Sequence, residues 1–458
     1  MNKPHKTFFI ILLASFIIRI FSVLTPNDLW WDSSVYIGMG KYIFSLGKVG
    51  LWEPNRPLIW PLLLGFFWKI GINTILAAKI IITFFSLSII SLTYFIALKV
   101  FDKKIALFSI LFLSFSTTFL RFNNILFSEI PSAFLLLFGV YFFLNDKHKL
   151  SGLFFGLAFM TRFFIIFSVI PVIALYISYW YKKKVSQKEI LSFFVAFSVP
   201  LILFLIINMS LYKNPIYPFI VQAYMTRNTG WIYHQPFSFY FLNLFKENIF
   251  IVFSIISISS ILRKKNKVLI LLLFLFPFIL YCIEQHKEMR LLIPLFPFLY
   301  ILTAQGIIVS INIIKKNKTY ILSLLTMIWL VQAYTTHMFD KYNDKLDVFY
   351  EYMNTSKIND GLWITNPSFI VYSNKKAEEL IYYPLYYSEK AKELQNKSEN
   401  AKAVLLNTCD ILPCPPSDKS CLKETQLLLG ILKKKMDLIY YQNYTQCQYY
   451  IFESHSTA

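Results

Sequence analysis

The chain has 458 residues, 56% of them hydrophobic and only 15% charged, and its net charge is +20. A soluble protein of this length needs a polar surface around its core, and so few charged residues do not supply one. The excess of Lys and Arg lies in short clusters between apolar runs, so we exclude a nucleic-acid partner and predict a polytopic α-helical membrane protein.

Basic clusters between apolar runs are typical of loops that remain in the cytoplasm, where they also face anionic lipid headgroups. If all of them are cytoplasmic, the number of membrane crossings between neighbouring clusters is even. The clusters are Lys3 and Lys6, Lys103 and Lys104, Lys147 and Lys149, Lys182 to Lys184, Arg263 to Lys265, and Lys315 and Lys316.

This rule predicts about 11 transmembrane helices within residues 1–336, because a helix needs about 20 apolar residues to cross a bilayer. The N-terminus is then cytoplasmic and the C-terminus lies outside. The predicted helices are 7–24, 75–101, 105–120, 129–144, a short pair within 151–180, 190–211, 248–262, 268–284, 291–313 and 319–336. Residues 25–74 form a long first outer loop with short interfacial helices, in which 57–74 is either a shallow helix or a further crossing.

Residues 337–458 have a different sequence pattern, with short strand-like runs and one helical stretch, 423–436. They predict a small extracytoplasmic α/β domain. Its four cysteines, on the outer side, favour disulfides, and a zinc site is the weaker alternative because the spacings are irregular. These cysteines are Cys409, Cys414, Cys421 and Cys447.

Several charged residues fall on the predicted outer side. Asp32 directly follows two tryptophans in the first outer loop, and a carboxylate beside a membrane is costly unless it is solvated, paired or used. Its simpler interpretation is a helix N-cap, by Asp32 or Ser33. Glu129 is interpreted in a similar way, as a first-turn residue after a Ser128 cap. Arg162 falls near the outer turn between two short helices.

The segment 284–290, EQHKEMR, carries three potential cations and two acids between two apolar helices. One interpretation is an interfacial loop in which Lys287 and Arg290 snorkel and pair with the glutamates. We favour an anion site, because Arg offers a planar fork for phosphate, Lys a compact charge and His one or two donors.

Together these features resemble the GT-C superfamily of glycosyltransferases, membrane enzymes that use polyprenyl-phosphate sugars on the outer or luminal side. The segment 286–294, HKEMRLLIP, resembles the HKE-x-RF motif of dolichyl-phosphate-mannose-dependent mannosyltransferases, with Leu291 where that family has Phe. The first outer loop and SGLFFGLAFMTRFFIIF at 151–167 are similar to the protein O-mannosyltransferase and aminoarabinose-transferase branch. The resemblance covers about residues 10–310.

The resemblance implies transfer of a sugar, such as the hexose mannose, from a polyprenyl- or dolichyl-phosphate carrier to an acceptor hydroxyl outside, by one inverting displacement. Asp32 is then the catalytic base. The donor phosphate meets His286, Lys287 and Arg290, with Arg56 and Arg162 as weaker candidates. We expect Asp32 and these cations to converge on one extracytoplasmic cavity. Further acids that the chain offers are Glu53, Glu129 and Glu288.

No cofactor is indicated, and a divalent metal stays open because Ser33, not an acid, follows Asp32. The acceptor is a glycan, a lipid or a protein, and the other partners are membrane lipids. The compact, Lys/Ile/Asn-rich chain favours the plasma membrane of a prokaryote, with an archaeon as one option. The alternatives are a transporter or lipid-linked-sugar flippase, in which charges gather at mid-membrane between repeats, and a non-catalytic scaffold.

Overall fold

The computed structural model describes residues 6–24, 29–229, 232–262, 267–313, 318–336, 346–381, 388–411, 414, 419–444 and 447–455. The basic clusters at Lys3, 263–265 and 315–316 lie outside these residues, as does 337–345, where the predicted domain boundary falls. The chain divides into two compact units. Unit 1 is Met1–Asn27, Pro54–Trp60 and Ala78–Lys341, and unit 2 is Asp28–Glu53, Pro61–Ala77 and Tyr342–Ala458.

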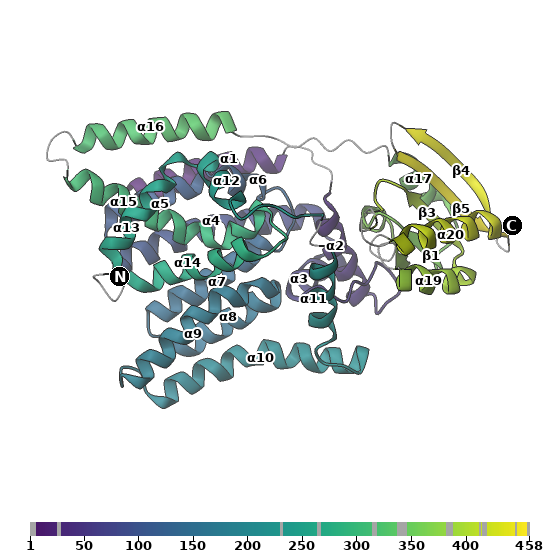
Figure 1. The fold of residues 1–458 in the computed structure, drawn as a ribbon, viewed down its shortest axis with the longest axis horizontal. Coiled ribbons are helices and arrows are strands. Elements are labelled where there is room, and N and C mark those ends of the chain that lie inside the picture. The colour runs from purple at the N-terminus through teal and green to yellow at the C-terminus, as the bar shows by residue number, and fades with distance from the viewer. Residues whose placement is uncertain are drawn as a thin grey trace. The chain divides into compact units, whose positions relative to one another are not determined.

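Unit 1 is helical (Figure 1). The helices of its first half are α1 (Lys6–Leu24), α4 (Thr74–Val100, whose first turn belongs to unit 2), α5 (Lys103–Ser114), α6 (Thr117–Arg121), α7 (Glu129–Leu144), α8 (His148–Thr161), η1 (Phe163–Ile165) and α9 (Ile166–Tyr181). Those of the second half are α10 (Gln187–Tyr212), α11 (Tyr217–Thr229), α12 (Phe239–Glu247), η2 (Ile249–Val252), α13 (Phe253–Leu262), α14 (Val268–Ile283), η4 (Met289–Leu295), α15 (Phe296–Ile313) and α16 (Lys318–Thr336).

A helix lies in each segment where the sequence predicts one, although 105–120 is divided between α5 and α6. Within the described residues, four segments are long and apolar enough to cross a membrane by length and composition: Thr74–Val100, Phe163–Tyr181, Gln187–Tyr212 and Met289–Ile313. Other apolar helices, such as α7 and α14, are shorter than about 20 residues. The chain is therefore a polytopic helical membrane protein, and the number of about 11 crossings stays a prediction.

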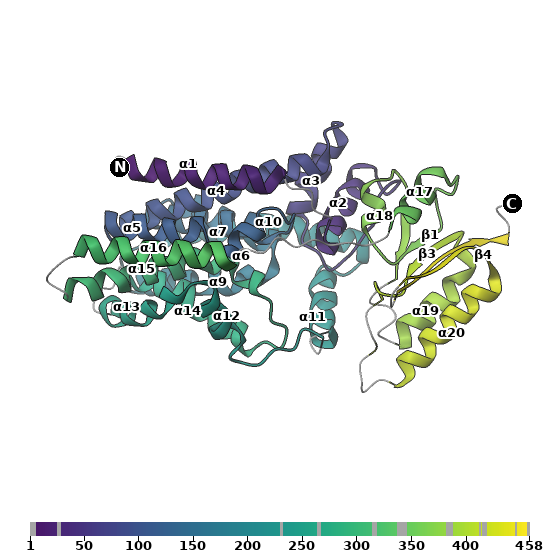
Figure 2. The same ribbon diagram turned by 90° about the horizontal axis from the view of Figure 1, so that it is seen from above.

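Close contacts between backbones hold the bundle together. A Cβ atom added to Gly156 of α8 would lie 2.5 Å from the carbonyl oxygen of Phe197 in α10. Small residues at such positions allow helices in a membrane to approach closely and gain dispersion contacts. α15 is buried along most of its length, and α1 lies along α4, where the ring of Phe8 packs on that of Tyr94 (Figure 2).

Unit 2 combines part of residues 25–74 with the C-terminal residues. Its sheet has the order β2-β1-β3-β5-β4, in which β1 is parallel to β2 and β3 and the remaining pairs are antiparallel. Its elements are α2 (Trp31–Phe44), most of α3 (Ile59–Lys69), α17 (Asp347–Thr355), β1 (Leu362–Ile364), α18 (Ser368–Val371), β2 (Ala377–Leu380), α19 (Ser388–Lys397), η6 (Ser398–Asn400), β3 (Ala403–Asn407), α20 (Lys419–Lys435), β4 (Met436–Tyr444) and β5 (Cys447–Ser454).

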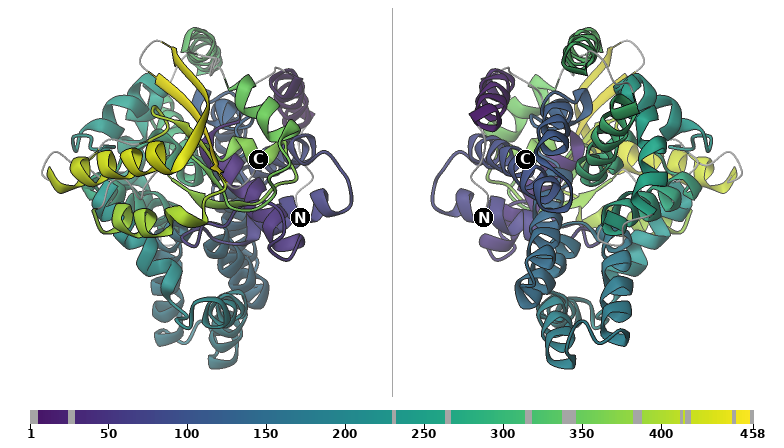
Figure 3. Two further views of the ribbon diagram at one scale, coloured as in Figure 1. Left: turned by 90° about the vertical axis from the view of Figure 1, so that its right-hand side faces the viewer. Right: turned by 90° about the vertical axis from the view of Figure 1, so that its left-hand side faces the viewer.

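The C-terminal sheet domain is confirmed, with differences in detail. α19 and α20 lie side by side (Figure 2) and α20 packs against β4 and β5 (Figure 3), around a core that includes Trp363, Val404 and Leu432. The strand-like run 362–373 is a strand only to Ile364, because Pro367 lacks the N–H that a sheet ladder needs and α18 follows it. Two disulfides join Cys409 to Cys447 and Cys414 to Cys421, and Cys282 is buried and free.

The contact between α8 and α10 is testable through Gly156. Gly156→Ala should destabilise the protein by about 1–3 kcal/mol, because the added methyl group meets a backbone carbonyl that cannot move alone. The measurement is thermal unfolding of the detergent-solubilised protein. Gly430→Ala is the matched control, since a Cβ there meets nothing within 4 Å in α20. A Gly156→Ala protein as stable as the wild type would contradict this packing.

Candidate active site

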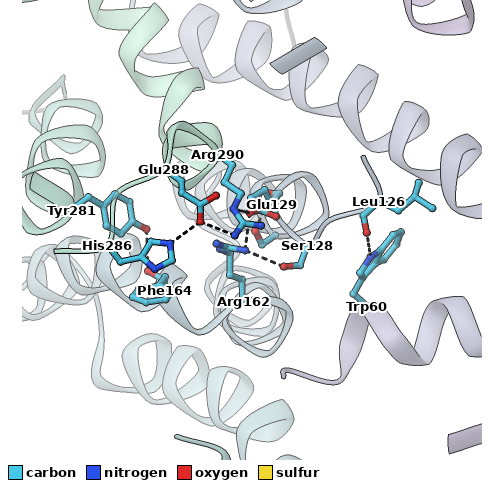
Figure 4. A network of polar contacts seen from close by, with 11 residues as sticks. Trp60, Leu126, Ser128, Glu129, Arg162, Phe164, Tyr281, His286, Glu288 and Arg290 are labelled. Atoms are coloured by element: carbon cyan, nitrogen blue, oxygen red, sulfur yellow. Dashed lines mark hydrogen bonds and ion pairs between the residues drawn. The ribbon is translucent and has the colours of Figure 1, made fainter. Parts of the chain in front are cut away.

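Three turns that are distant in sequence meet in unit 1 (Figure 4). The first is the start of α7, the second the break between α8 and α9, and the third the segment before α15. Each is predicted to lie on the outer side of the membrane. Their polar side chains form one group, here called the Glu129 cluster: Ser128, Glu129, Arg162, His286, Glu288 and Arg290.

Glu129 lies at the centre of the cluster, with only 1% of its side chain exposed. Its Oε1 is 3.0 Å from Nη1 of Arg162 and 3.6 Å from Nε of Arg290. A carboxylate so deeply buried is costly unless cations compensate for it, and here two guanidinium groups do so. Glu129 therefore links the three turns by electrostatic attraction.

Glu288 is the second acid of the cluster and lies nearer its surface. Its Oε1 accepts hydrogen bonds from Nε2 of His286 at 2.6 Å and from Nη2 of Arg290 at 2.7 Å. Burial opposes ionisation of Glu288, but these hydrogen bonds and the positive charge of Arg290 prevail and lower its pKa to about 2. The hydrogen bond requires the proton of His286 to be on Nε2 whenever the ring is neutral.

Local backbone structure aims these side chains at one another. Arg162 is extended between α8 and η1, so the helical path is interrupted where its guanidinium meets Glu129 and Ser128. Glu129 is the first residue of α7, where the positive end of the helix dipole favours a carboxylate. Arg290 lies in the 3₁₀ segment η4, which contains Pro294 and leads into α15. Its guanidinium carbon Cζ is 4.8 Å from the centroid of the Phe127 ring.

Lys287 lies apart from the cluster and is buried. Its ammonium donates hydrogen bonds to the carbonyl oxygens of Gln235, at 2.9 Å, and Glu284. The backbone N–H of Lys287 donates to Tyr233, whose ring stacks on His286 with centroids 4.4 Å apart. Residues 233–235 are thus held to His286 and Lys287 by hydrogen bonds and a ring contact.

The remaining predicted residues lie elsewhere. Arg56 is half-buried in the Pro54–Trp60 segment of unit 1, where Nε1 of Trp60 donates to the carbonyl oxygen of Leu126 at 3.0 Å (Figure 4). Asp32 and Glu53 belong to unit 2. Asp32 is half-buried in the first turn of α2, whose N-cap is Trp30 instead of Asp32 or Ser33. Convergence of Asp32 with the Glu129 cluster stays a prediction.

The cluster as a whole differs from a simple cationic patch. Two guanidinium groups face two carboxylates, and His286 adds one titratable ring. An anion there would be held by directed N–H donors more than by excess positive charge, since each guanidinium has five donors. Among the described residues, no group of three or more His, Cys, Asp or Glu is placed to hold a metal ion.

Residues 7–361 match the model of the Alg9-like mannosyltransferase family. The chain belongs to this family. It is therefore a GT-C glycosyltransferase, as the HKE-like motif and the outer-loop pattern predict. No curated protein matches the chain in sequence.

Solved structures of other membrane glycosyltransferases share the fold. ArnT from Cupriavidus metallidurans bound to undecaprenyl phosphate is 10% identical, with a TM-score of 0.65 over 98% of each chain. The oligosaccharyltransferase of Archaeoglobus fulgidus, in complex with Zn and sulfate, is 12% identical, with a TM-score of 0.62 over 87% of this chain and 67% of that one. The structural similarity establishes a common fold, and identity this low leaves the substrate open.

The role of Glu129 in holding the three turns is testable. Glu129→Gln keeps the shape of the side chain but removes the carboxylate that faces Arg162 and leaves Arg290 with Glu288 alone, so we expect a loss of about 3–5 kcal/mol of stability. Thermal unfolding in detergent measures it. The control is Glu399→Gln, because Glu399 is 77% exposed in its ion pair with Lys435 and such pairs contribute little. Equal unfolding temperatures for both variants would contradict the role of Glu129.

The low pKa of Glu288 predicts how stability depends on pH. Its folded-state pKa of about 2 lies below the unfolded value of 4.5, so its contribution is complete above pH 4.5 and declines as the pH falls toward 2. Unfolding temperatures of the wild type should therefore fall more steeply over this range than those of Glu288→Gln. Glu351→Gln, on an exposed residue, should retain the wild-type slope. Parallel slopes for the wild type and Glu288→Gln would refute the assignment.

Proposed function

We propose that the protein transfers a hexose, with mannose as the first candidate, from a polyprenyl- or dolichyl-phosphate carrier to an acceptor hydroxyl on the extracytoplasmic side. The observation that carries this proposal is the Glu129 cluster, which presents Arg162, His286 and Arg290 together in a member of the Alg9-like mannosyltransferase family. The likeness in fold to ArnT with bound undecaprenyl phosphate supports a lipid-phosphate donor.

The leaving group of this reaction is the lipid phosphate. As the bond from the sugar C1 to the phosphate oxygen breaks, negative charge grows on that phosphate, and donors already fixed in place stabilise it without reorganising. Arg290 is fixed by Glu129 and Glu288, and Arg162 by Glu129 and Ser128. The N–H groups of these guanidiniums that do not face carboxylates would contact the phosphate, together with His286.

The nucleophile is the acceptor hydroxyl. Asp32 accepts the proton of this hydroxyl while the hydroxyl oxygen bonds to C1 of the sugar. The products are the glycosylated acceptor and the polyprenyl phosphate. A double displacement would need a second carboxylate as nucleophile. Glu129 does not suit that role, because its side chain is 1% exposed and compensated by two guanidinium groups. We therefore propose a single displacement with inversion.

Three turns that the charge pattern assigns to the outer side meet in one cluster, which supports the proposed topology. An odd number of crossings between any two of these turns would have separated them by the length of a helix. We propose that the cluster and the C-terminal sheet domain are extracytoplasmic, in the plasma membrane of a prokaryote.

The acceptor is a glycan, a lipid or a protein hydroxyl. Lys287 and Arg56 stay proposed phosphate contacts, and Lys287 also holds residues 233–235 in place.

Purified protein supplied with radiolabelled polyprenyl-phosphate mannose tests the proposal. Asp32→Asn should lower turnover by about 10²–10⁴-fold, because the acceptor keeps its proton. Arg290→Gln should weaken binding of the carrier phosphate. Asp360→Asn, on a residue with a 69% exposed side chain, is the control for removing an acid.

Full turnover in Asp32→Asn would remove the base assignment, and undiminished carrier binding in Arg290→Gln would remove the phosphate assignment. Movement of the intact donor across vesicle membranes, without cleavage of the sugar–phosphate bond, would instead identify a flippase.

A further inference from the structure

We propose that the C-terminal sheet domain positions the helix that carries Asp32, and that Lys41 is the positioning residue through which it acts. This inference rests on the proposed function, in which Asp32 is the base. The observations that carry it are contacts within unit 2, where residues of the first outer loop pack with residues more than 300 positions later in the chain.

Lys41 joins α2 to the C-terminal domain. Its ammonium is buried, with the residue 4% exposed, and it donates to three backbone carbonyl oxygens: Ile370 at 3.0 Å, Val371 at 2.6 Å and Ser373 at 2.9 Å. An ammonium has three N–H donors, so all of them are used. Ile370 and Val371 end α18, where helical carbonyl groups lack intrahelical partners. A buried charge is retained only with such complete hydrogen bonding, so this contact specifies one arrangement of α2.

Gly50 makes a second connection between the same two parts of the chain. Its N–H donates to Lys375 at 2.9 Å, and its carbonyl oxygen accepts from Ala377 at 2.8 Å, which adds one residue to the edge of the sheet beside β2. Gly50 has φ of +98°, and a Cβ there would lie 2.7 Å from the backbone nitrogen of Tyr42 in α2. Only glycine fits between the helix and the sheet edge.

These contacts reach Asp32 through the helix itself. Asp32 is in the first turn of α2 and Lys41 in the last, so about 13 Å of continuous helix separates them. Every residue from Ser33 to Lys41 is buried, and Gly40 packs closely on Gly65 of α3. A helix held in this way transmits a change at Lys41 to Asp32 as a tilt or shift. A general base displaced by about 1 Å can lose about 10²-fold in rate.

The C-terminal domain is therefore part of the catalytic apparatus in this proposal, although its residues do not touch the reacting atoms. The donor phosphate is held by the Glu129 cluster of unit 1, in which Lys41 takes no part. Loss of the Lys41 contact should consequently lower the rate of transfer and leave carrier binding unchanged.

The test is Lys41→Met in the full-length protein, with Lys48→Met as the matched control on an exposed lysine of the same loop. The amount of undecaprenyl phosphate bound at saturation gives the number of protein molecules that can bind the carrier. Turnover of polyprenyl-phosphate mannose per binding molecule should fall about 10²-fold in Lys41→Met, with KM for the donor unchanged. A loss of molecules that are unfolded throughout would not change turnover counted in this way. Lys41→Arg, which retains a charged donor group, should recover part of the rate.

Wild-type turnover per binding molecule in Lys41→Met would overturn the proposal, as would equal losses in Lys41→Met and Lys48→Met. If Lys41→Met does not fold, amide hydrogen exchange of the wild type decides the question. The amides of α2 should then exchange with the same opening free energy as those of β1 and β3, as one cooperative unit. Independent, faster exchange of α2 would overturn the proposal. Full activity of Asp32→Asn would instead overturn the proposed function, so the two failures are distinguishable.

Discussion

The structure depends on how a largely apolar helical bundle accommodates buried charge. The carboxylate of Glu129 is buried, which is costly without compensating charge, and Arg162 and Arg290 supply that charge from two other turns. Because removing any one partner would leave an uncompensated charge, the three turns are held in register by one another. The same pairing fixes the orientation of both guanidinium groups.

The charged side chains of the Glu129 cluster gather where helices of unit 1 are interrupted. Arg162 follows the last residue of α8 in an extended conformation, and Arg290 lies in a 3₁₀ segment before α15. A continuous α-helix would point these side chains at neighbours along its own surface, whereas an interruption directs them toward other turns. Another junction, between α5 and α6, is stabilised by Glu247, whose carboxylate accepts hydrogen bonds from Ser116, Thr117 and Thr118.

Unit 2 shows a different solution to the same problem of buried polarity. Its buried cation, Lys41, is compensated by carbonyl groups instead of a carboxylate, and these belong to a segment more than 300 residues later. Part of residues 25–74 consequently shares the core of unit 2: α2 is buried by its neighbours there, and Gly50, which follows α2, forms hydrogen bonds with Lys375 and Ala377 at the sheet edge. The sheet domain gives α2 buried contacts and hydrogen-bond acceptors that lipid would not provide.

Much of this protein follows from its sequence alone. The hydropathy pattern located the helices of unit 1, the short strand-like runs and one helical stretch located the sheet domain, and the HKE-like motif at 286–290 pointed to the superfamily together with the pattern of residues 25–74. These features depend on residues near one another in the chain, so local periodicity and spacing reveal them. The short strand β2 and the polar helix α19 escaped detection, because a strand of four residues and a helix of low hydrophobicity carry little periodic signal.

The tertiary structure decided which charges meet. Glu129 has the sequence context of an ordinary first-turn residue, yet it is the centre of the cluster. Lys287 appears equivalent to Arg290 in the motif, yet its ammonium faces the carbonyl oxygens of Gln235 and Glu284. Lys41 resembles any lysine at the end of an interfacial helix until α18 is placed beside it. Such partners are chosen by packing between distant segments, because the cost of burying a charge depends on what surrounds it in space and not on its neighbours in sequence.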